Sequence, residues 1–220
     1  MSPSLIQSPP SYRTVADLVA KLGGVPLDRI RMNPLPGTAT VDDLLQNNDI
    51  ERGIPCELID GTLIEKSGMS YLEDSLTTVL ATFLHTYLWS KRIGKGFTAG
   101  ALYKLVDGNF RLPDFSVCLN DKFPTGKVER VPYADFAPDL AVEVLSKNNT
   151  AAEIERKQRE LFGSGTQLIW VVDPVARTVT VWSSMNEQVT LTEQQTLTGG
   201  TLLPGFELSI AEWFRQAEEI

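Results

Sequence analysis

The sequence predicts an α/β domain in which helices flank a central mixed sheet. Three observations support this class. Apolar residues three or four positions apart run from 70 to about 92, which is typical of one long amphipathic helix. The segments LAVEVL at 140–145 and QLIWVVD at 167–173 are typical of strands. A helical segment at 150–163 separates these two strands, so helices and strands alternate along the chain.

Residues 1–48 are expected to form a small helical N-terminal appendage, and residues 49–220 the main domain. The appendage contains two predicted helices, TVADLVAKL at 14–22 and VDDLLQN at 41–47, and Thr40 is the expected cap of the second. The main domain is expected to open with a hairpin at 56–66. Its turn is Asp60-Gly61, a dipeptide suited to a tight two-residue connection.

The rest of the main domain follows in order. After the long helix we expect strands at 97–106 and 110–119, joined by a turn. The polar segment at 120–138 is typical of a functional loop or lid, with a disordered segment as the alternative. Thr150 and Glu153 predict a capping box at the start of the next helix, which ends near Gly163. Strands at 167–173 and 178–182 are expected to turn at Asp173-Pro174, and the segment 202–219 predicts a last strand and a closing helix.

Composition narrows the functional classes. A net charge of -8 and a pI near 4.8 argue against a non-specific nucleic-acid binder, although an acidic protein can still hold a local basic groove. The apolar stretches are too short for a membrane span and the N-terminus lacks a signal pattern, so we expect a cytoplasmic protein. Two distant cysteines, Cys56 and Cys118, and one histidine, His85, exclude a zinc cage built from these side chains.

Glu143 is the first candidate site residue, because it interrupts an apolar strand. Strand alternation places it on one face with Ala141 and Leu145. A buried carboxylate needs a cation, a donor network or a water-filled cleft, and a structural ion pair is the alternative to a functional site. Asp139 lies about 13 Å away along the strand, too far to share an ion with Glu143, and is expected to open the strand.

Asp114 and Lys157 complete the candidate site. Pro113 marks a bend or edge, and the strand that carries Asp114 can lie beside the strand of Glu143. Two such carboxylates form a hard-oxygen site suited to Mg²⁺ or Mn²⁺. Lys157 lies on the sheet-facing stripe of its helix, between Ile154 and Leu161, although a lysine there can also extend past the sheet edge to solvent. Two acids, a lysine and a divalent metal are typical of phosphodiester cleavage.

At these residues the sequence resembles the PD-(D/E)xK superfamily. LPD at 112–114 and VEVL at 142–145 resemble its signature, with 29 residues from acid to acid. The chain is also similar to a large bacterial family assigned to the endonucleases, the Uma-two type. That likeness runs from about Glu57 to the C-terminus and rests on five segments: CELIDGTLIEK, RLPDFSV, APDLAVEVLS, AEIERKQRELFGSGTQLIWVVDP and LLPGFELS.

The resemblance implies a restriction-endonuclease-like core, in which Asp114 and Glu143 bind Mg²⁺ or Mn²⁺. The superfamily usually places its lysine two residues after the second acid, where this chain has Leu145. Some relatives carry the lysine on the following helix, which Lys157 matches. Lys147 is the rival, because it is expected to share the strand face of Glu143, one step further along the strand. An acid on the first helix is also frequent, and Glu73 matches it, although a solvated first-turn acid is an equal interpretation.

Three hypotheses follow. The first is a metal-dependent endonuclease acting on nucleic acid, with DNA favoured, and fold analogy favours a homodimer. The second is a non-catalytic nuclease-fold module that binds nucleic acid or a protein. The third is a hydrolase of small phosphates or nucleotides, which would need no basic groove.

Overall fold

The computed structural model describes residues 12–48 and 54–219. The predicted boundary between appendage and main domain, at 48/49, falls where a segment outside the described residues begins, so it stays a prediction. Within the described residues, no helix is both long and apolar enough to cross a membrane.

The N-terminal helices pack on a small sheet of four strands. Helices α1 (Val15–Lys21) and α2 (Val41–Asn47) each begin at a threonine with a complete capping box, as predicted for Thr40. A 3₁₀ helix, η1 (Leu27–Arg29), lies between them. The sheet has the order β2-β1-β5-β4. Its strands are β1 (Cys56–Ile59), β2 (Thr62–Glu65), β4 (Tyr103–Lys104) and β5 (Phe110–Arg111).

The β1–β2 hairpin turns through two residues, as predicted. Ile59 pairs with Thr62 across the turn. Asp60 and Gly61 both have positive φ, which is the requirement of the tight turn that suits twisted strands. Leu18 and Leu22 from α1 pack on one side of this small sheet, and Leu44 from α2 packs in a separate cluster with other strand residues.

The larger sheet has six strands in the order β10-β9-β8-β7-β6-β3. They are β3 (Gly94–Thr98), β6 (Phe115–Leu119), β7 (Leu140–Val144), β8 (Leu168–Asp173), β9 (Thr178–Ser184) and β10 (Glu187–Thr192). β7 and β8 are parallel and are joined by helix α4 (Ala151–Gly163), whereas the other neighbours are antiparallel. The predicted α/β class with a central mixed sheet is therefore confirmed.

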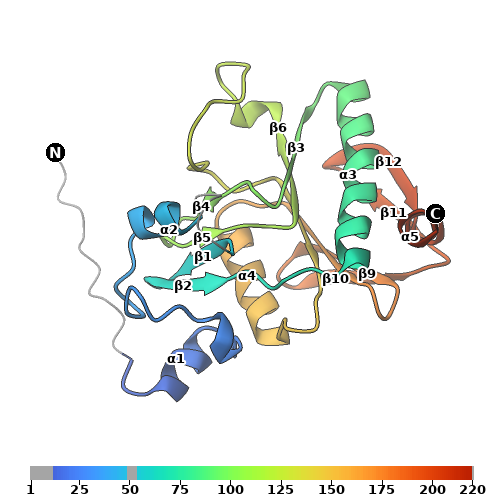
Figure 1. The fold of residues 1–220 in the computed structure, drawn as a ribbon. Coiled ribbons are helices and arrows are strands. Elements are labelled where there is room, and N and C mark those ends of the chain that lie inside the picture. The colour runs from blue at the N-terminus through green and yellow to red at the C-terminus, as the bar shows by residue number, and fades with distance from the viewer. Residues whose placement is uncertain (1–11, 49–53, 220) are drawn as a thin grey trace.

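Helices cover both faces of this larger sheet (Figure 1). Helices α3 (Tyr71–Lys91) and α5 (Ile210–Glu218) lie on one face, where Leu80, Trp170 and Trp213 are buried in one cluster. The ribbon β11 (Thr196–Gly199) and β12 (Leu203–Ser209) joins the same cluster. Helix α4 packs on the opposite face through Leu161. Strand alternation in β7 explains the division: even-numbered residues meet α3, and odd-numbered residues face α4.

Two strand predictions need correction, and two strands were missed. The predicted strands 97–106 and 110–119 are each divided between the two sheets, because a turn after Thr98 and the bend at Pro113 redirect the chain. β10 and β11 were not predicted at all. β10 is an edge strand in which Val189 and Leu191 alternate with polar residues, but Val189 is 52% exposed and two apolar residues are too few to indicate a strand.

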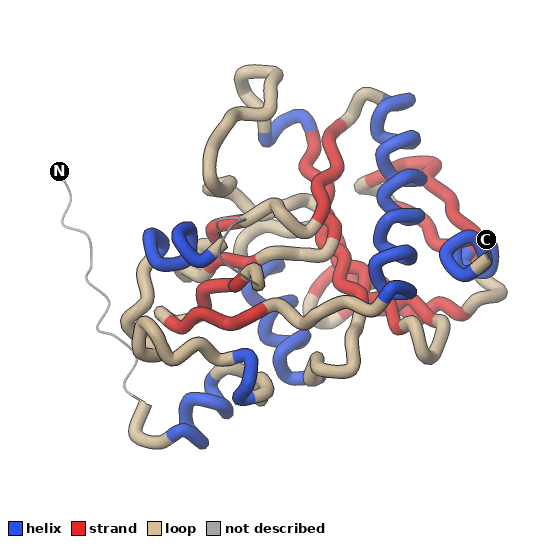
Figure 2. The backbone as a smooth tube through the Cα atoms, viewed as in Figure 1, coloured by secondary structure: helices blue, strands red, loops and turns tan. Residues whose placement is uncertain are grey.

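The predicted capping box at the start of α4 is only half formed. Thr150 Oγ1 accepts a hydrogen bond from the backbone N–H of Glu153, as a cap does. The Glu153 carboxylate does not reach back to Thr150, because it binds the Arg29 guanidinium instead. The polar segment 120–138 is almost entirely loop apart from η2 (Asn120–Lys122) (Figure 2).

Candidate active site

The pairing of β6 with β7 brings Asp114 and Glu143 to the same pocket. Phe115 pairs with Val142, and the backbone N–H of Asp114 donates to the Val142 carbonyl at 3.1 Å. Asp114 Oδ2 accepts a hydrogen bond from the backbone N–H of Val144 at 2.8 Å. Both carboxylates are buried, and both line one small cavity of about 30 Å³. The sequence argument that the strand of Asp114 lies beside that of Glu143 is confirmed.

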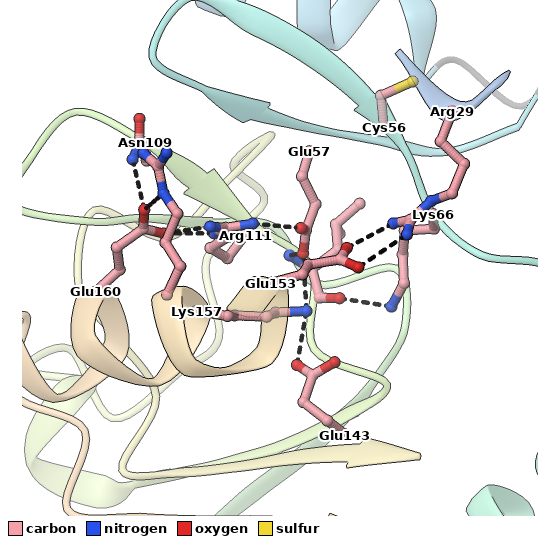
Figure 3. Close-up of polar contacts among 12 residues, drawn as sticks. Arg29, Cys56, Glu57, Lys66, Asn109, Arg111, Glu143, Glu153, Lys157 and Glu160 are labelled. Carbon is pink, nitrogen blue, oxygen red and sulfur yellow. Dashed lines mark hydrogen bonds and ion pairs between the residues drawn. The ribbon is translucent and has the colours of Figure 1, made fainter. Parts of the chain in front are cut away.

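Lys157 reaches this pocket from α4. Its Nζ lies 2.7 Å from Glu143 Oε1 and 2.9 Å from Glu57 Oε1. Figure 3 shows the Lys157 side chain extending from the helix between these two carboxylates. Lys157 is 5% exposed, so it faces the interior and does not extend past the sheet edge to solvent. The structure thus brings together the three residues that the sequence singled out.

Glu57 is a site residue that sequence reasoning missed. It lies on β1, and its Oε2 accepts a hydrogen bond from Arg111 Nη1 at 2.8 Å. Its Oε1 also accepts from the backbone N–H of Leu112 at 2.8 Å. The carboxylate therefore has three partners, counting Lys157, and anchors the cations around it. The signal available in the sequence was an acid inside the apolar run CELI.

Lys66 is the second missed residue. It follows β2, and its Nζ donates to Asp114 Oδ1 at 2.8 Å and to the Leu112 carbonyl at 2.5 Å. Each of the two predicted acids therefore has its own lysine, Lys66 for Asp114 and Lys157 for Glu143. Nothing in the hairpin pattern distinguishes Lys66 from an ordinary solvated lysine at a strand end.

The electrostatics of the two glutamates differ because their partners differ. Burial raises the pKa of Glu143 to about 7, since Lys157 offsets only part of the desolvation and Asp114 adds repulsion. Burial also acts on Glu57, but Lys157 and Arg111 outweigh it, so the pKa of Glu57 lies well below its ordinary value. Burial lowers the pKa of Lys157, and the Glu143 and Glu57 carboxylates more than reverse this, so its pKa is raised.

A network of ion pairs holds the pocket on its α4 side. Arg111 binds Glu57 on one side and Glu160 of α4 on the other, with an Arg111 Nε to Glu160 Oε2 distance of 2.6 Å. Near the N-terminal end of the same helix, Arg29 binds Glu153 through two hydrogen bonds of 2.7 and 2.9 Å. Buried ion pairs from Arg29 and Arg111 therefore fix the position of helix α4, and with it that of Lys157.

The remaining candidates lie away from the pocket. Asp139 opens β7 as expected, where its carboxylate accepts hydrogen bonds from Leu119 N–H and the Gln167 amide. Lys147 is exposed in a turn after β7. The expectation that it shares the strand face of Glu143 is therefore wrong. Glu73 completes the capping box of α3, which agrees with the first-turn interpretation. His85 is exposed on α3.

A cavity of about 770 Å³ lies elsewhere, against the 120–138 segment. It is larger than the pocket at Glu143, but its lining is mostly apolar and aromatic, with lysines and acids that do not converge on one point. The residues that the sequence singled out lie in the smaller pocket, where three carboxylates and two ammonium groups meet.

Two of these carboxylates keep capacity for a cation. Glu143 Oε1 makes its ion pair with Lys157 but has no hydrogen bond to any residue of the described ranges. Each Asp114 oxygen has one donor and retains a lone pair. No group of three or more His, Cys, Asp or Glu side chains in residues 12–48 and 54–219 forms a metal cage. Magnesium is commonly held by only one or two protein carboxylates, so Asp114 and Glu143 fit such an ion.

Comparisons with known proteins bear on the fold and the family. The chain is similar to a crystal structure described as "a putative nuclease" from Anabaena variabilis, with a TM-score of 0.71 and 21% identity over 81% of this chain and 98% of that one. This likeness shows the expected nuclease-like fold. No curated protein matches the chain. A model of the Uma2 family, described as "Putative restriction endonuclease", matches residues 41–211, from the start of α2 into α5. The chain therefore belongs to the Uma2 family.

Proposed function

We propose that the protein is a metal-dependent endonuclease that hydrolyses phosphodiester bonds of nucleic acid, with DNA as the favoured substrate. The observation that carries the proposal is the convergence on one pocket of Asp114, which directly precedes β6, Glu143 on β7 and Lys157 on α4. Family membership supports the same reaction class. Because the three residues come from separate elements, their meeting is a property of the whole fold.

Asp114 and Glu143 would hold a divalent cation, Mg²⁺ or Mn²⁺. Such an ion, when bound, lowers the pKa of a coordinated water and neutralises phosphate charge. The chain supplies two oxygen donors whose positions are set by the β6–β7 pairing and by the hydrogen bond from Val144. Burial strengthens the attraction of these carboxylates for a cation, because little water screens them.

Lys157 would act as a fixed positive charge. Its raised pKa keeps the side chain protonated at neutral pH, so it is unsuited to accept a proton from water. Held by Glu57 and Glu143, the ammonium is positioned to attract a phosphate oxygen and to stabilise charge that develops in the transition state. Glu57 and Arg111 are positioning residues for Lys157 in this proposal, because they act through it.

The test is cleavage of single- and double-stranded DNA and RNA with Mg²⁺ or Mn²⁺. We expect Asp114→Asn and Glu143→Gln each to lose activity by at least a hundredfold, because each removes a charged metal ligand. Glu207→Gln is the matched control, since Glu207 is an exposed carboxylate on β12. Equal activity in the wild type and both pocket variants would contradict the proposal.

One observation favours a second candidate, a non-catalytic module of the same fold. Both predicted metal ligands already carry an ammonium partner, so the cluster is close to balanced without a metal. Calorimetric titration with Mn²⁺ separates the candidates. Absence of binding at millimolar metal, together with absence of cleavage, would select the non-catalytic module. Cleavage of nucleotides without cleavage of polymers would instead select a hydrolase of small phosphates.

The homodimer stays a prediction from fold analogy. An endonuclease that cuts both strands needs two active sites, which a symmetric pair supplies. Sedimentation of the full chain, with and without a DNA duplex, measures the oligomeric state directly. A mass corresponding to one chain under both conditions would contradict the expectation.

A further inference from the structure

Lys66 occupies the position from which a cation would approach Asp114. Its Nζ lies 2.8 Å from Asp114 Oδ1 and donates to the Leu112 carbonyl at 2.5 Å. Lys66 lines the same small pocket as Glu143 and Lys157. The Lys66 ammonium and a divalent cation would therefore compete for one carboxylate, and the two positive charges would repel each other at close range.

The two lysines of the pocket are held in different ways. The Lys157 side chain is 7% exposed, binds two glutamates and belongs to a helix packed on the sheet. The Lys66 side chain is 15% exposed and binds one carboxylate. It lies at the end of β2, an edge strand, and the chain from 66 to 70 forms no helix or strand. A flexible four-carbon stem at such a position can withdraw towards solvent without disturbing the core.

We propose that Lys66 is a tethered cation that sets the metal affinity of the site by occupying Asp114 until a divalent ion displaces it. This inference rests on the proposed function, because it assumes that Asp114 is a metal ligand. Lys66 keeps the buried Asp114 charge paired when metal is scarce. Metal binding then requires the Lys66–Asp114 ion pair to open, so the apparent affinity is lower than two free carboxylates would give.

The test measures Mn²⁺ affinity by titration calorimetry on the full chain. Lys66→Met removes the charge and keeps the length of the side chain, and we expect at least tenfold tighter binding. Lys66→Gln guards against misfolding, because its amide can still donate to Leu112 and Asp114, and it should tighten binding in the same direction. Lys66→Arg keeps the charge and should bind as the wild type does.

Lys122→Met is the matched control outside the pocket. Lys122 Nζ lies 3.8 Å from the buried carboxylate of Asp139, so this variant also removes the lysine from a buried acid, without touching Asp114. We expect its Mn²⁺ affinity to equal that of the wild type. Tighter binding by this control as well would overturn the assignment to Lys66.

A second readout is the stabilisation that Mn²⁺ gives to each variant in thermal unfolding. Without metal, Lys66→Met should unfold at a lower temperature than the wild type, because Asp114 loses its partner. With saturating metal its gain should exceed that of the wild type. If Lys66→Met and Lys66→Gln bind Mn²⁺ with wild-type affinity while Asp114→Asn does not bind it, the proposed role of Lys66 is overturned but the metal site is not. Absence of Mn²⁺ binding in every variant would overturn the metal site and this inference together.

Discussion

Replacing Arg29 with methionine is expected to lower the free energy of unfolding by about 3–5 kcal/mol. Arg29 and Glu153 are 7% and 5% exposed, and they form two hydrogen bonds of 2.9 and 2.7 Å. Methionine preserves much of the side-chain volume but leaves the Glu153 carboxylate buried without its cation. The main cost is therefore this unpaired charge rather than a packing defect.

The magnitude follows from the contacts that are lost. Arg29 also donates to the backbone carbonyls of Glu65 at 2.8 Å and Asn148 at 3.3 Å, and each such bond contributes on the order of 1 kcal/mol. Glu153→Gln in the Arg29→Met background removes the isolated charge. The double variant is therefore expected to be more stable than Arg29→Met alone by about 2 kcal/mol, which a double-mutant cycle detects as coupling.

The assay is equilibrium unfolding in urea, with Arg159→Met as the control. Arg159 pairs with Glu155 on the same helix, but these side chains are 57% and 58% exposed. An exposed pair is screened by water, so the control should change the free energy of unfolding by no more than about 0.5 kcal/mol. Equal losses in Arg29→Met and Arg159→Met would refute the reasoning, because burial would then make no difference.

Two further stability predictions rest on local geometry. Gly61→Ala should destabilise more than Gly108→Ala in urea unfolding, by about 1–3 kcal/mol. Both glycines have positive φ, but a Cβ at Gly61 would lie 2.7 Å from the Gly37 carbonyl, whereas Gly108 has no atom within 4 Å. Equal losses in the free energy of unfolding would show that the strain of a positive φ, and not the contact with Gly37, determines the cost of both substitutions. Leu80→Ala, at a fully buried position of α3, should cost about 2–5 kcal/mol in the same assay. Thr82→Ala, exposed on the same helix, should change stability by less than about 0.5 kcal/mol, and a loss equal to that of Leu80→Ala would contradict the assigned core face.

Much of the pocket could be predicted because its residues break local patterns. Glu143 is a charge inside an apolar strand, Lys157 lies on the sheet-facing stripe of α4, and Pro113 marks the bend beside Asp114. Each of these signals is contained within about ten residues. The faces of Glu143 and Lys157 follow from the strand and helical periods, and Asp114 was expected nearby because its strand can lie beside that of Glu143.

The rest of the pocket depends on contacts that no local pattern encodes. Glu57 and Lys157 are 100 positions apart, and Lys66 and Asp114 are 48 apart. Lys66 looks like an ordinary solvated lysine at a strand end, and the acid of Glu57 inside the short run CELI does not identify its distant partner. Glu153 shows the same limit, because the local pattern predicts a capping box but the distant Arg29 outcompetes the Thr150 backbone N–H for its carboxylate.

The way in which charges are paired argues for a functional rather than a structural pocket. A buried ion pair kept only for stability gains little over apolar residues of similar volume, so a structural cluster should at least satisfy every polar atom. Glu57 meets this requirement, because each of its oxygens accepts a hydrogen bond, whereas Arg111 Nη2 has an ion pair with Glu160 but no hydrogen bond within the described residues. Glu143 does not meet it either, since its Oε1 has an ammonium neighbour but no hydrogen bond within the described residues, and its pKa is raised. Glu143, which the sequence alone had marked as out of place, is thus a buried carboxylate whose pKa lies above its ordinary value, and groups in such a state are concentrated at catalytic and binding sites.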